Sequence, residues 1–313
     1  MGVGGGCMFS SANCVDSPIA SHVISESWLR QIADSTNQVV QLALGLNNVA
    51  RNGATMEPRR VGVGQKTAVT FPGFCNTHDT ALFRCLEQNR FSATSEQLLA
   101  LAYRSTCREA CAKQQMVACY FPQVLDESAH PLMARAVLNE MNICARLLAW
   151  KKALEEMLLG GRNALAGYVV EFGVRPSLLA SVTFSLAQTF TGRKLDARYE
   201  WITLSILPSA NGGFAVFSWN KRAPKNPSLL VKSFKAIPRE LQSAALVNLV
   251  LEMSENVFIA PDWWNALPQS LQNPMLARFS RSITSGNPAP PGASLLPKPP
   301  PVVDWKIVKS DYT

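Results

Sequence analysis

The chain has 313 residues, of which 47% are hydrophobic, and this allows one large or two modest domains with an apolar core. Its 30 Lys and Arg outnumber its 22 Asp and Glu, and the formal net charge of +8 favours an anionic partner such as nucleic acid or, alternatively, a solvated basic surface. No apolar run is long enough to span a bilayer, so we expect no membrane partner. Eight cysteines in a chain of this size do not indicate a disulfide framework.

The N-terminus and the motif content narrow the classes further. Residues 1–6 are rich in glycine and lack the apolar segment of a secretory signal, which predicts a cytoplasmic, reducing location. The sequence has no Ser/His/Asp hydrolase signature, no dinucleotide-binding fingerprint and no set of kinase motifs. Its three histidines are too few for most His-rich metalloenzyme sites.

A group of cysteines and histidines near the N-terminus predicts a metal site. Cys75 and His78 have the two-residue spacing of a zinc half-site, and Gly73 permits a tight turn just before them. Cys7 and Cys14 form a second pair across a loop that is longer than usual. Since zinc takes four such ligands in a tetrahedron, we predict a structural zinc ion here. The alternative is that these cysteines are buried packing residues.

The order of these motifs resembles the HNH family, which has a treble-clef fold, over roughly residues 1–90. Two cysteines are followed by residues 21–25 (SHVIS) and then by residues 75–79 (CNTHD). In that family a zinc knuckle precedes a strand that carries a His, and a second knuckle opens a helix. The resemblance implies that His22 is a general base for a water that attacks a phosphate, with a divalent metal such as Mg²⁺ or Mn²⁺ stabilising the leaving oxygen. Asp79 stands where the family often has Asn.

Two functions therefore stay open. The first is a zinc-stabilised, nucleic-acid-binding protein that is non-catalytic or has a degenerate HNH-like site. The alternative is a metal-dependent HNH-type endonuclease in which His22 and Asp79 are catalytic. Residues 71–87, together with Trp263 and Trp264, also resemble a group of bacterial proteins to which no function is attached. Both tryptophans are expected to pack into the core; alternatively, an exposed Trp of this pair would suit a base or a protein partner.

The region that carries these motifs is expected to contain two helices and a strand. Apolar spacing predicts a helix over residues 27–33, and Gly and Asn residues mark a loop over 45–53. Residues 61–71 are predicted to form a strand that leads into Cys75. A helix is predicted over 79–88 because its apolar side chains share one face.

Two long helices are predicted in the middle of the chain. The first covers residues 92–120, and Pro122 with the polar residues 123–128 is expected to end it. The second covers residues 131–159 and starts at Pro131, which suits a first helical turn. The short connection predicts that the two helices form an antiparallel hairpin.

Four side chains of the first long helix are candidates for binding. Arg104 and Arg108 share one face and are expected to meet phosphate or, alternatively, water and a carboxylate such as Glu109. Cys107 and Cys111 also lie one turn apart. They form a thiol pair, a second metal half-site or a packing seam of small residues, and the packing seam is favoured.

The second half of the chain is predicted to be rich in strands. Strands are expected over residues 181–190, 201–207 and 214–219, and residues 208–213 (PSANGG) indicate a hairpin turn between the last two. A helix is expected over residues 238–255.

Basic and proline-rich segments flank these elements. Lys221, Arg222 and Lys225 form a basic loop after the hairpin, which contacts a phosphate backbone or is a solvated turn. Seven prolines between 286 and 303 predict an extended tail. Residues 302–313 are expected to dock as a short strand.

Together these patterns predict an α+β protein with four regions. These are a treble-clef-like metal-binding region over 1–90, a helical hairpin over 91–165, a small antiparallel sheet with helices over 166–285 and a Pro-rich tail over 286–313. The predicted zinc ligands are Cys7, Cys14, Cys75 and His78, the predicted catalytic pair is His22 and Asp79, and the predicted nucleic-acid contacts are Arg104, Arg108, Lys221 and Arg222.

Overall fold

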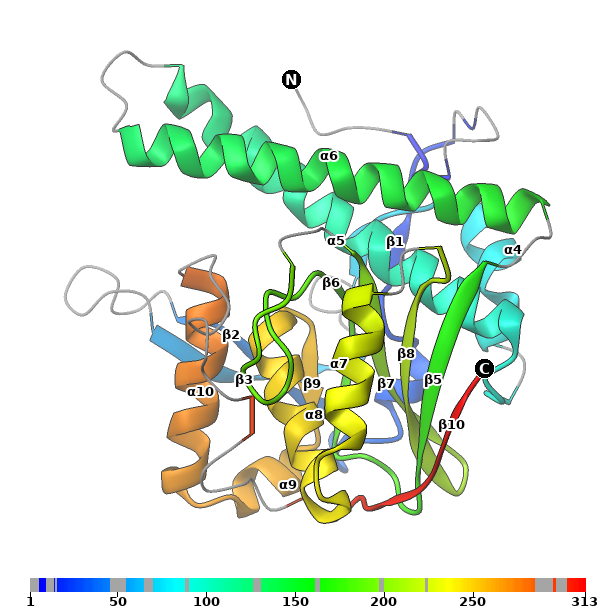
Figure 1. Cartoon of the computed structure of the whole chain (residues 1–313), viewed down its shortest axis with the longest axis vertical. Coiled ribbons are helices and arrows are strands. Elements are labelled where there is room, and N and C mark those ends of the chain that lie inside the picture. The colour runs from blue at the N-terminus through cyan, green and yellow to red at the C-terminus, as the bar shows by residue number, and fades with distance from the viewer. Residues whose placement is uncertain are drawn as a thin grey trace.

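An antiparallel sheet runs through the centre of the molecule in the computed structural model (Figure 1). The structure describes residues 6–9, 14, 16–45, 55–64, 70–87, 90–125, 131–160, 164–196, 200–222, 225–284, 295–296 and 303–313. Within them the sheet consists of β2 (Gln38–Gly45), β3 (Thr55–Gly62), β5 (Leu165–Phe172), β6 (Leu178–Phe184), β7 (Ile202–Ser209), β8 (Gly212–Asn220), β9 (Val257–Ile259) and β10 (Ile307–Tyr312). Their order across the sheet is β10-β5-β8-β7-β6-β9-β2-β3.

Both faces of this sheet pack against helices. Successive side chains of a strand point to opposite faces, and both faces carry apolar side chains. Val170 lies in an apolar core that includes residues of α7 (Lys225–Lys235), α8 (Arg239–Met253) and α10 (Gln269–Thr284). Its neighbour Val169 lies in a second core, which includes residues of α4 (Asn76–Glu87), α5 (Ser95–Val124) and α6 (Pro131–Gly160). The sheet therefore forms the middle of three layers.

The hairpin between β7 and β8 confirms the predicted turn. Ser209 pairs with Gly212, so Ala210 and Asn211 form a two-residue connection, and Pro208 belongs to β7. A Cβ atom on Gly212 would lie 2.1 Å from the carbonyl oxygen of Phe172, which explains why glycine is needed where β8 passes β5.

The long helical hairpin is confirmed. α5 and α6 lie side by side, and α6 extends beyond the rest of the molecule in Figure 1. α5 begins with a capping box in which Thr94 accepts the backbone N–H of Gln97. The helix ends within the segment 122–128 that was expected to end it, but it continues past Pro122 to Val124. Pro122 lies in the last turn and is exposed.

Near the N-terminus the strands differ from the expectation. The helix predicted over 27–33 is the single turn α1 (Glu26–Leu29), and β2 follows it. The strand predicted over 61–71 is replaced by β3 and a short β4 (Thr70–Pro72). β4 pairs with β1 (Ala20–His22) in a separate two-stranded sheet. Most of the predicted loop at 45–53 lies outside the described residues.

In the second half, β6 replaces the strand predicted over 181–190, and α8 confirms the predicted helix. Lys225 is the first residue of α7, so the basic segment is shorter than the expected loop. The two tryptophans belong to α9 (Pro261–Ala266), in which Trp264 is buried and Trp263 packs against the core. β10 confirms the terminal strand, whereas most of the Pro-rich tail lies outside the described residues.

The α+β class is thus confirmed. The antiparallel sheet has more strands than the one predicted from residues 166–285 alone. β2 and β3 come from the N-terminal region, and β10 comes from the end of the chain. Among the described residues, no helix combines the length and the apolar character needed to cross a membrane.

Candidate metal centre

The predicted zinc ligands meet where two loops and a helix converge. Cys75 directly precedes α4 and His78 lies in its first turn, while Cys7 and Cys14 come from the N-terminal segment. Backbone hydrogen bonds hold this segment against the turn before α4. The N–H of Met8 donates to the carbonyl of Gly73 over 2.7 Å, and the N–H of Ile19 donates to that of Phe74, also over 2.7 Å.

The four donor atoms form a compact group, with all distances within 4.8 Å. The Sγ atoms of Cys14 and Cys75 are 3.7 Å apart. The Nδ1 atom of His78 is 3.4 Å from Sγ of Cys7 and 3.3 Å from Sγ of Cys75. The two local pairs, which are 61 or more residues apart in the sequence, therefore form one site.

This geometry fits a tetrahedral zinc ion. Zinc binds cysteine sulfur at about 2.3 Å and histidine nitrogen at about 2.0 Å, which places neighbouring ligand atoms of a tetrahedron roughly 3.5–3.8 Å apart. The distances of 3.3, 3.4 and 3.7 Å between donor atoms lie close to this range. Three thiolates with one imidazole are also a donor set that is common in structural zinc sites. The group can therefore hold a metal ion, and its chemistry is compatible with zinc.

Backbone N–H groups point at two of the sulfurs. The N–H of Cys75 donates to Sγ of Cys7 over 3.2 Å, and the N–H of His78 donates to Sγ of Cys75 over 3.5 Å. Such hydrogen bonds favour the thiolate form that a metal requires. At Cys14, a hydrogen bond with the backbone of Asp16 lowers the pKa, but burial and the neighbouring thiols outweigh it, so the net pKa is raised. A bound cation would reverse the repulsion among the thiolates.

The site is embedded in an aromatic cluster. Cys7 and Cys75 are buried, whereas Cys14 and His78 are partly exposed. The ring of Phe9 lies 4.8 Å from that of His78, and Phe74 packs against Tyr103 of α5 at 5.6 Å. These contacts attach the metal site to the core beneath the helical hairpin.

A buried polar network, which the sequence analysis missed, lies behind this cluster. The hydroxyl of Tyr103 donates to the carboxylate of Glu155 over 2.5 Å, and Nζ of Lys151 contacts the same oxygen at 2.5 Å. The hydroxyl also lies 3.5 Å from the carbonyl of Met8, next to Cys7. Burial raises the pKa of Tyr103, so the phenol stays protonated. The only sequence signal was an i, i+4 Lys–Glu pair within an apolar helix.

His22 and Asp79 lie outside the group of metal ligands. His22 is at the end of β1 and is half-buried. Burial lowers its pKa and Arg104 adds to this, whereas Glu26, Glu87 and Asp79 oppose it. Asp79 lies in the first turn of α4, and its Oδ1 is buried with no hydrogen-bond partner in the described part of the chain. Neither residue joins three or more close potential ligands there, and Cys7, Cys14, Cys75 and His78 form the one such group.

The expectation that Arg104 contacts a phosphate was wrong. Its side chain is only 3% exposed, pairs with Glu87 at 2.8 Å and lies over the ring of Phe83 at 4.1 Å. Arg104 therefore serves the packing of α4 on α5. By contrast, Lys221 and Arg222 are both exposed between β8 and α7.

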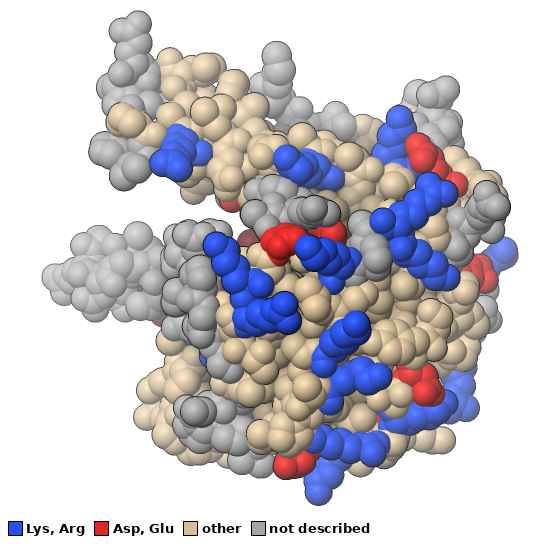
Figure 2. Space-filling view, viewed as in Figure 1, with Lys and Arg blue, Asp and Glu red and all other residues tan. Residues whose placement is uncertain are grey.

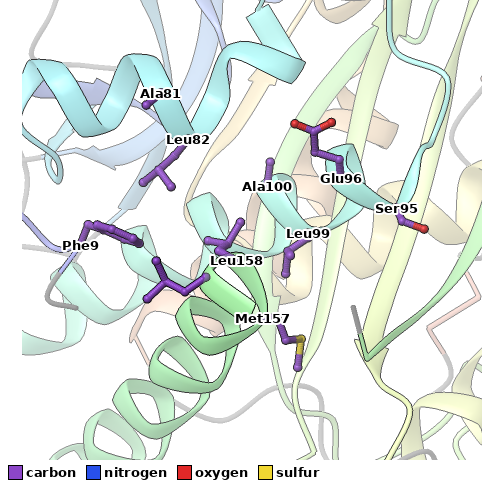
Figure 3. A pocket seen from close by; sticks show the side chains of 10 residues that line it. Phe9, Ala81, Leu82, Ser95, Glu96, Leu99, Ala100, Met157 and Leu158 are labelled. Atoms are coloured by element: carbon purple, nitrogen blue, oxygen red, sulfur yellow. The ribbon is translucent and has the colours of Figure 1, made fainter. Parts of the chain in front are cut away.

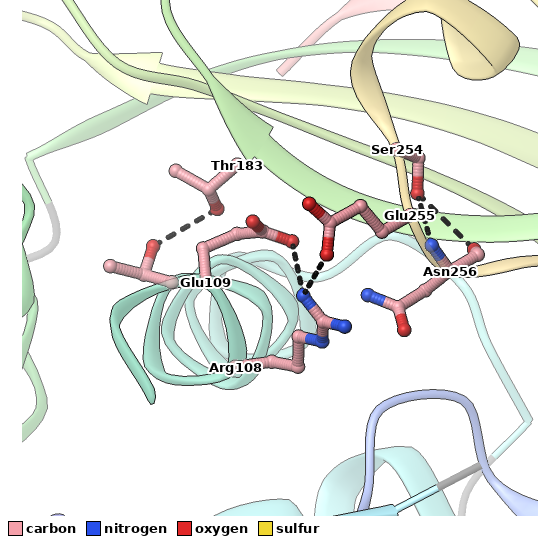
Figure 4. A network of polar contacts seen from close by, with 7 residues as sticks. Arg108, Glu109, Thr183, Ser254, Glu255 and Asn256 are labelled. Carbon is pink, nitrogen blue, oxygen red and sulfur yellow. Dashed lines mark hydrogen bonds and ion pairs between the residues drawn. The ribbon is translucent and has the colours of Figure 1, made fainter. Parts of the chain in front are cut away.

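Arg108 takes part in an acidic network (Figure 4). Its guanidinium lies 3.5 Å from Glu109 and 3.5 Å from Glu255, so acidic side chains already occupy its surroundings. The same helix is tied to the sheet by a hydrogen bond of 3.1 Å between Thr106 and Thr183. These contacts give Arg108 a structural role and agree with the alternative expected for it.

Cys107 and Cys111 are both buried in the core beside α5 and are not part of the metal group. Burial raises the pKa of each thiol, and this keeps both in the neutral form. The packing seam is therefore the role that the structure supports.

A stability change with pH is expected from Glu109. Burial raises its pKa from 4.5 to about 7, against the opposing effect of Arg108 and with a contribution from Glu255. The folded state thus holds a proton that the unfolded state has lost, so ionisation of Glu109 destabilises the fold as pH rises from about 4.5 to 7. We expect Glu109→Gln to remove this loss, which is worth up to about 3 kcal/mol at pH 8, as measured by urea unfolding at pH 5 and pH 8.

The matched control is Glu255→Gln, because the side chain of Glu255 is 48% exposed. This variant should keep most of the pH dependence of the wild type. If the free energy of unfolding of Glu109→Gln changed between pH 5 and pH 8 as much as that of the wild type, Glu109 would not be the source of the pH dependence.

A groove of about 400 Å³ lies beside the metal site (Figure 3). Phe9, which touches His78, forms part of its wall. The remaining wall is mainly apolar and comes from α4, α5 and α6, with Ser95 and Glu96 at one end. A single carboxylate gives this groove no second metal site and no acid–base pair.

No family model, no curated protein and no solved structure matches this chain. The functional conclusions therefore rest on the residues and their geometry.

Proposed function

We propose that the chain is a non-catalytic nucleic-acid-binding protein whose N-terminal region is held together by a structural zinc ion. The observation that carries the metal part is the closed group of four protein donors. Catalytic zinc sites keep a position open for water or substrate, whereas structural sites fill all four positions with protein atoms. Cys7, Cys14, Cys75 and His78 would fill all four, and the ion supplies a cross-link between the N-terminal segment and α4.

The nucleic-acid part of the proposal is supported by charge. The chain carries a net charge of +8, and Lys221 and Arg222 remain exposed, whereas Arg104 is buried and Arg108 is balanced by acids. A basic surface attracts the phosphate backbone without reading the bases.

The resemblance to the HNH family fits the same proposal. Cys7 and Cys14 precede the β1–β4 pair, and Cys75 and His78 open α4. This is the order of a treble clef, with residues 23–69 inserted between the two short strands. The likeness supports a zinc-stabilised fold and leaves the activity to be tested.

A second candidate is an HNH-type endonuclease, and one observation favours it. The lowered pKa of His22 keeps the imidazole neutral near pH 7, as a general base requires. His22 would take a proton from the attacking water, and a bound Mg²⁺ or Mn²⁺ would supply charge stabilisation. The lack of a second group of close metal ligands among the described residues weighs against this candidate.

Cleavage assays with the His22→Ala variant separate the two functions. We expect purified wild-type protein to cleave neither plasmid DNA nor RNA in the presence of Mg²⁺ or Mn²⁺, and to behave like His22→Ala. Both proteins should retain the same bound zinc and the same circular dichroism spectrum. Cleavage by the wild type that is lost in a folded, zinc-loaded His22→Ala variant would establish the endonuclease instead.

A further inference from the structure

Most of the net positive charge of the chain comes from one segment. Residues 193–240 contain nine Lys or Arg and three Asp or Glu, a surplus of six within a chain whose net charge is +8. Seven of these basic residues, all exposed, belong to α7 or to the segments that flank it, and we name them the α7 basic face: Arg193, Lys194, Lys221, Arg222, Lys225, Lys232 and Lys235.

Hydrogen bonds place these segments next to one another. The side chain of Asn226 donates to the carbonyl of Asp196 over 3.0 Å, at the start of α7. Further along the helix, the hydroxyl of Ser233 accepts the N–H of Phe190 over 3.2 Å. The turn that carries Arg193 therefore runs alongside α7. Figure 2 shows Lys and Arg gathered over this side of the molecule, with few acidic residues among them.

Little of this charge is neutralised within the protein. Lys225 pairs with Asp196 at 2.5 Å, and Lys235 lies over the ring of Tyr312 at 4.9 Å. In the part of the chain that the structure describes, the other five members of the face form no ion pair. The face is thus unlike Arg104 and Arg108, whose charges are balanced by acids.

We propose that the α7 basic face binds the phosphodiester backbone of nucleic acid. This inference rests on the proposed function and assigns the surface that performs it. At 1.5 Å per residue, the 11 residues of α7 span about 16 Å. The phosphates of one strand rise by about 3.4 Å each along the axis of a duplex, so α7 is as long as the axial rise of about five phosphates.

The composition of the face favours nucleic acid over an anionic membrane. A helix that binds a lipid surface also presents large apolar side chains to it. The apolar side chains of α7, such as Leu230, Val231 and Phe234, are buried in the core. Among the described residues, none of the exposed large hydrophobic side chains belongs to the segments of the face, and the exposed ring of Tyr312 is the one that lies against it, at Lys235.

The contacts expected from this face are independent of base sequence. Lysine is a point charge, and both Lys and Arg bind phosphate oxygens well. Such binding releases counterions, so the logarithm of the affinity falls linearly with the logarithm of the salt concentration. Each lost phosphate contact lowers that slope by about 0.9 for duplex DNA and by about 0.7 for a single strand.

The test measures binding of the full chain to two fluorescent probes, a DNA duplex and a single-stranded RNA of about 20 nucleotides, by anisotropy at several salt concentrations. The variant combines Lys221→Gln, Arg222→Gln and Lys232→Gln. We expect at least a tenfold loss of affinity at low salt and a slope on duplex DNA that is smaller by about 2–3. The control combines Arg59→Gln, Arg90→Gln and Lys152→Gln, which remove the same charge from exposed sites outside the face.

The outcomes separate the inference from the proposed function. An equal loss of affinity in both triple variants, or no loss in either, shows that the α7 basic face is not the binding surface. Nucleic-acid binding by the protein would still stand. Failure of the wild type to bind either probe overturns both. Binding of the wild type to phosphatidylserine vesicles, without binding to the probes, also overturns both and assigns the charge to a lipid surface. Equal circular dichroism spectra of the variants show that they are folded.

Discussion

Cys75→Ser is expected to release the bound metal and to unfold the N-terminal region. Cys75 is buried, and its sulfur lies within 3.7 Å of two other ligand atoms. The apparent binding free energy of structural zinc in small peptides is about 10–16 kcal/mol, which is as large as the whole stability of many domains, about 5–15 kcal/mol. Even a net loss of about 3 kcal/mol lowers the Tm of a chain of this size by roughly 5 °C.

Hydrogen exchange should localise this change. We expect the variant to lose protection in residues 16–29 and 70–87, while the central strands β6 and β7 keep theirs. Cys119→Ser is the matched control, because Cys119 is exposed and lies outside the metal group. A Cys75→Ser variant with the Tm and exchange pattern of this control would show that the cysteines merely pack.

Glu155→Leu is expected to destabilise the fold by about 3–5 kcal/mol, because removal of one partner of a buried ion pair leaves an uncompensated charge. Glu155 is fully buried and accepts both the hydroxyl of Tyr103 and the ammonium of Lys151. The side chain of Lys151 is itself only 7% exposed. Chemical unfolding of the variant and the wild type measures the difference.

The double variant Lys151→Met/Glu155→Leu is the informative control. It replaces the whole pair with apolar groups of similar size, which is often neutral or stabilising, so most of the lost stability should return. If Glu155→Leu lowered the free energy of unfolding by less than about 1 kcal/mol, or if the double variant did not recover it, Lys151 and Glu155 would not act as a buried ion pair that stabilises the fold.

Local patterns predicted those parts of the metal site that depend on neighbours in the sequence. Cys75 and His78 are three residues apart at the start of a helix, so their spacing alone brings them together. Cys7 and Cys14 had weaker spacing, and backbone hydrogen bonds such as that from Met8 to Gly73 bring them to the site. The Tyr103–Glu155–Lys151 network joins two long helices, and no local pattern reveals which residues of such helices meet.

The sheet shows a similar division. The β7–β8 hairpin was predictable because a short turn rich in Asn and Gly joins two apolar strands. β3 was missed because it lies at the edge of the sheet, where Pro58, Arg59 and Arg60 are tolerated although they are unusual in an inner strand. α7 was also missed, since the basic residues at its start suggested a loop.

Burial decided which basic residues remain candidates for binding. Arg104 and Arg108 share a helical face, which in sequence terms suits a phosphate. The tertiary structure buries Arg104 against α4 and places Glu255, 147 residues away, beside Arg108. Lys221 and Arg222, by contrast, kept the exposure that was expected of them.

The metal content of the purified wild-type protein, combined with its X-ray absorption spectrum, tests the zinc site directly. We expect about one zinc per chain, bound by three sulfur atoms and one nitrogen atom, as the group of Cys7, Cys14, Cys75 and His78 requires. A protein that is folded without metal, or a metal surrounded mainly by oxygen, would contradict this expectation.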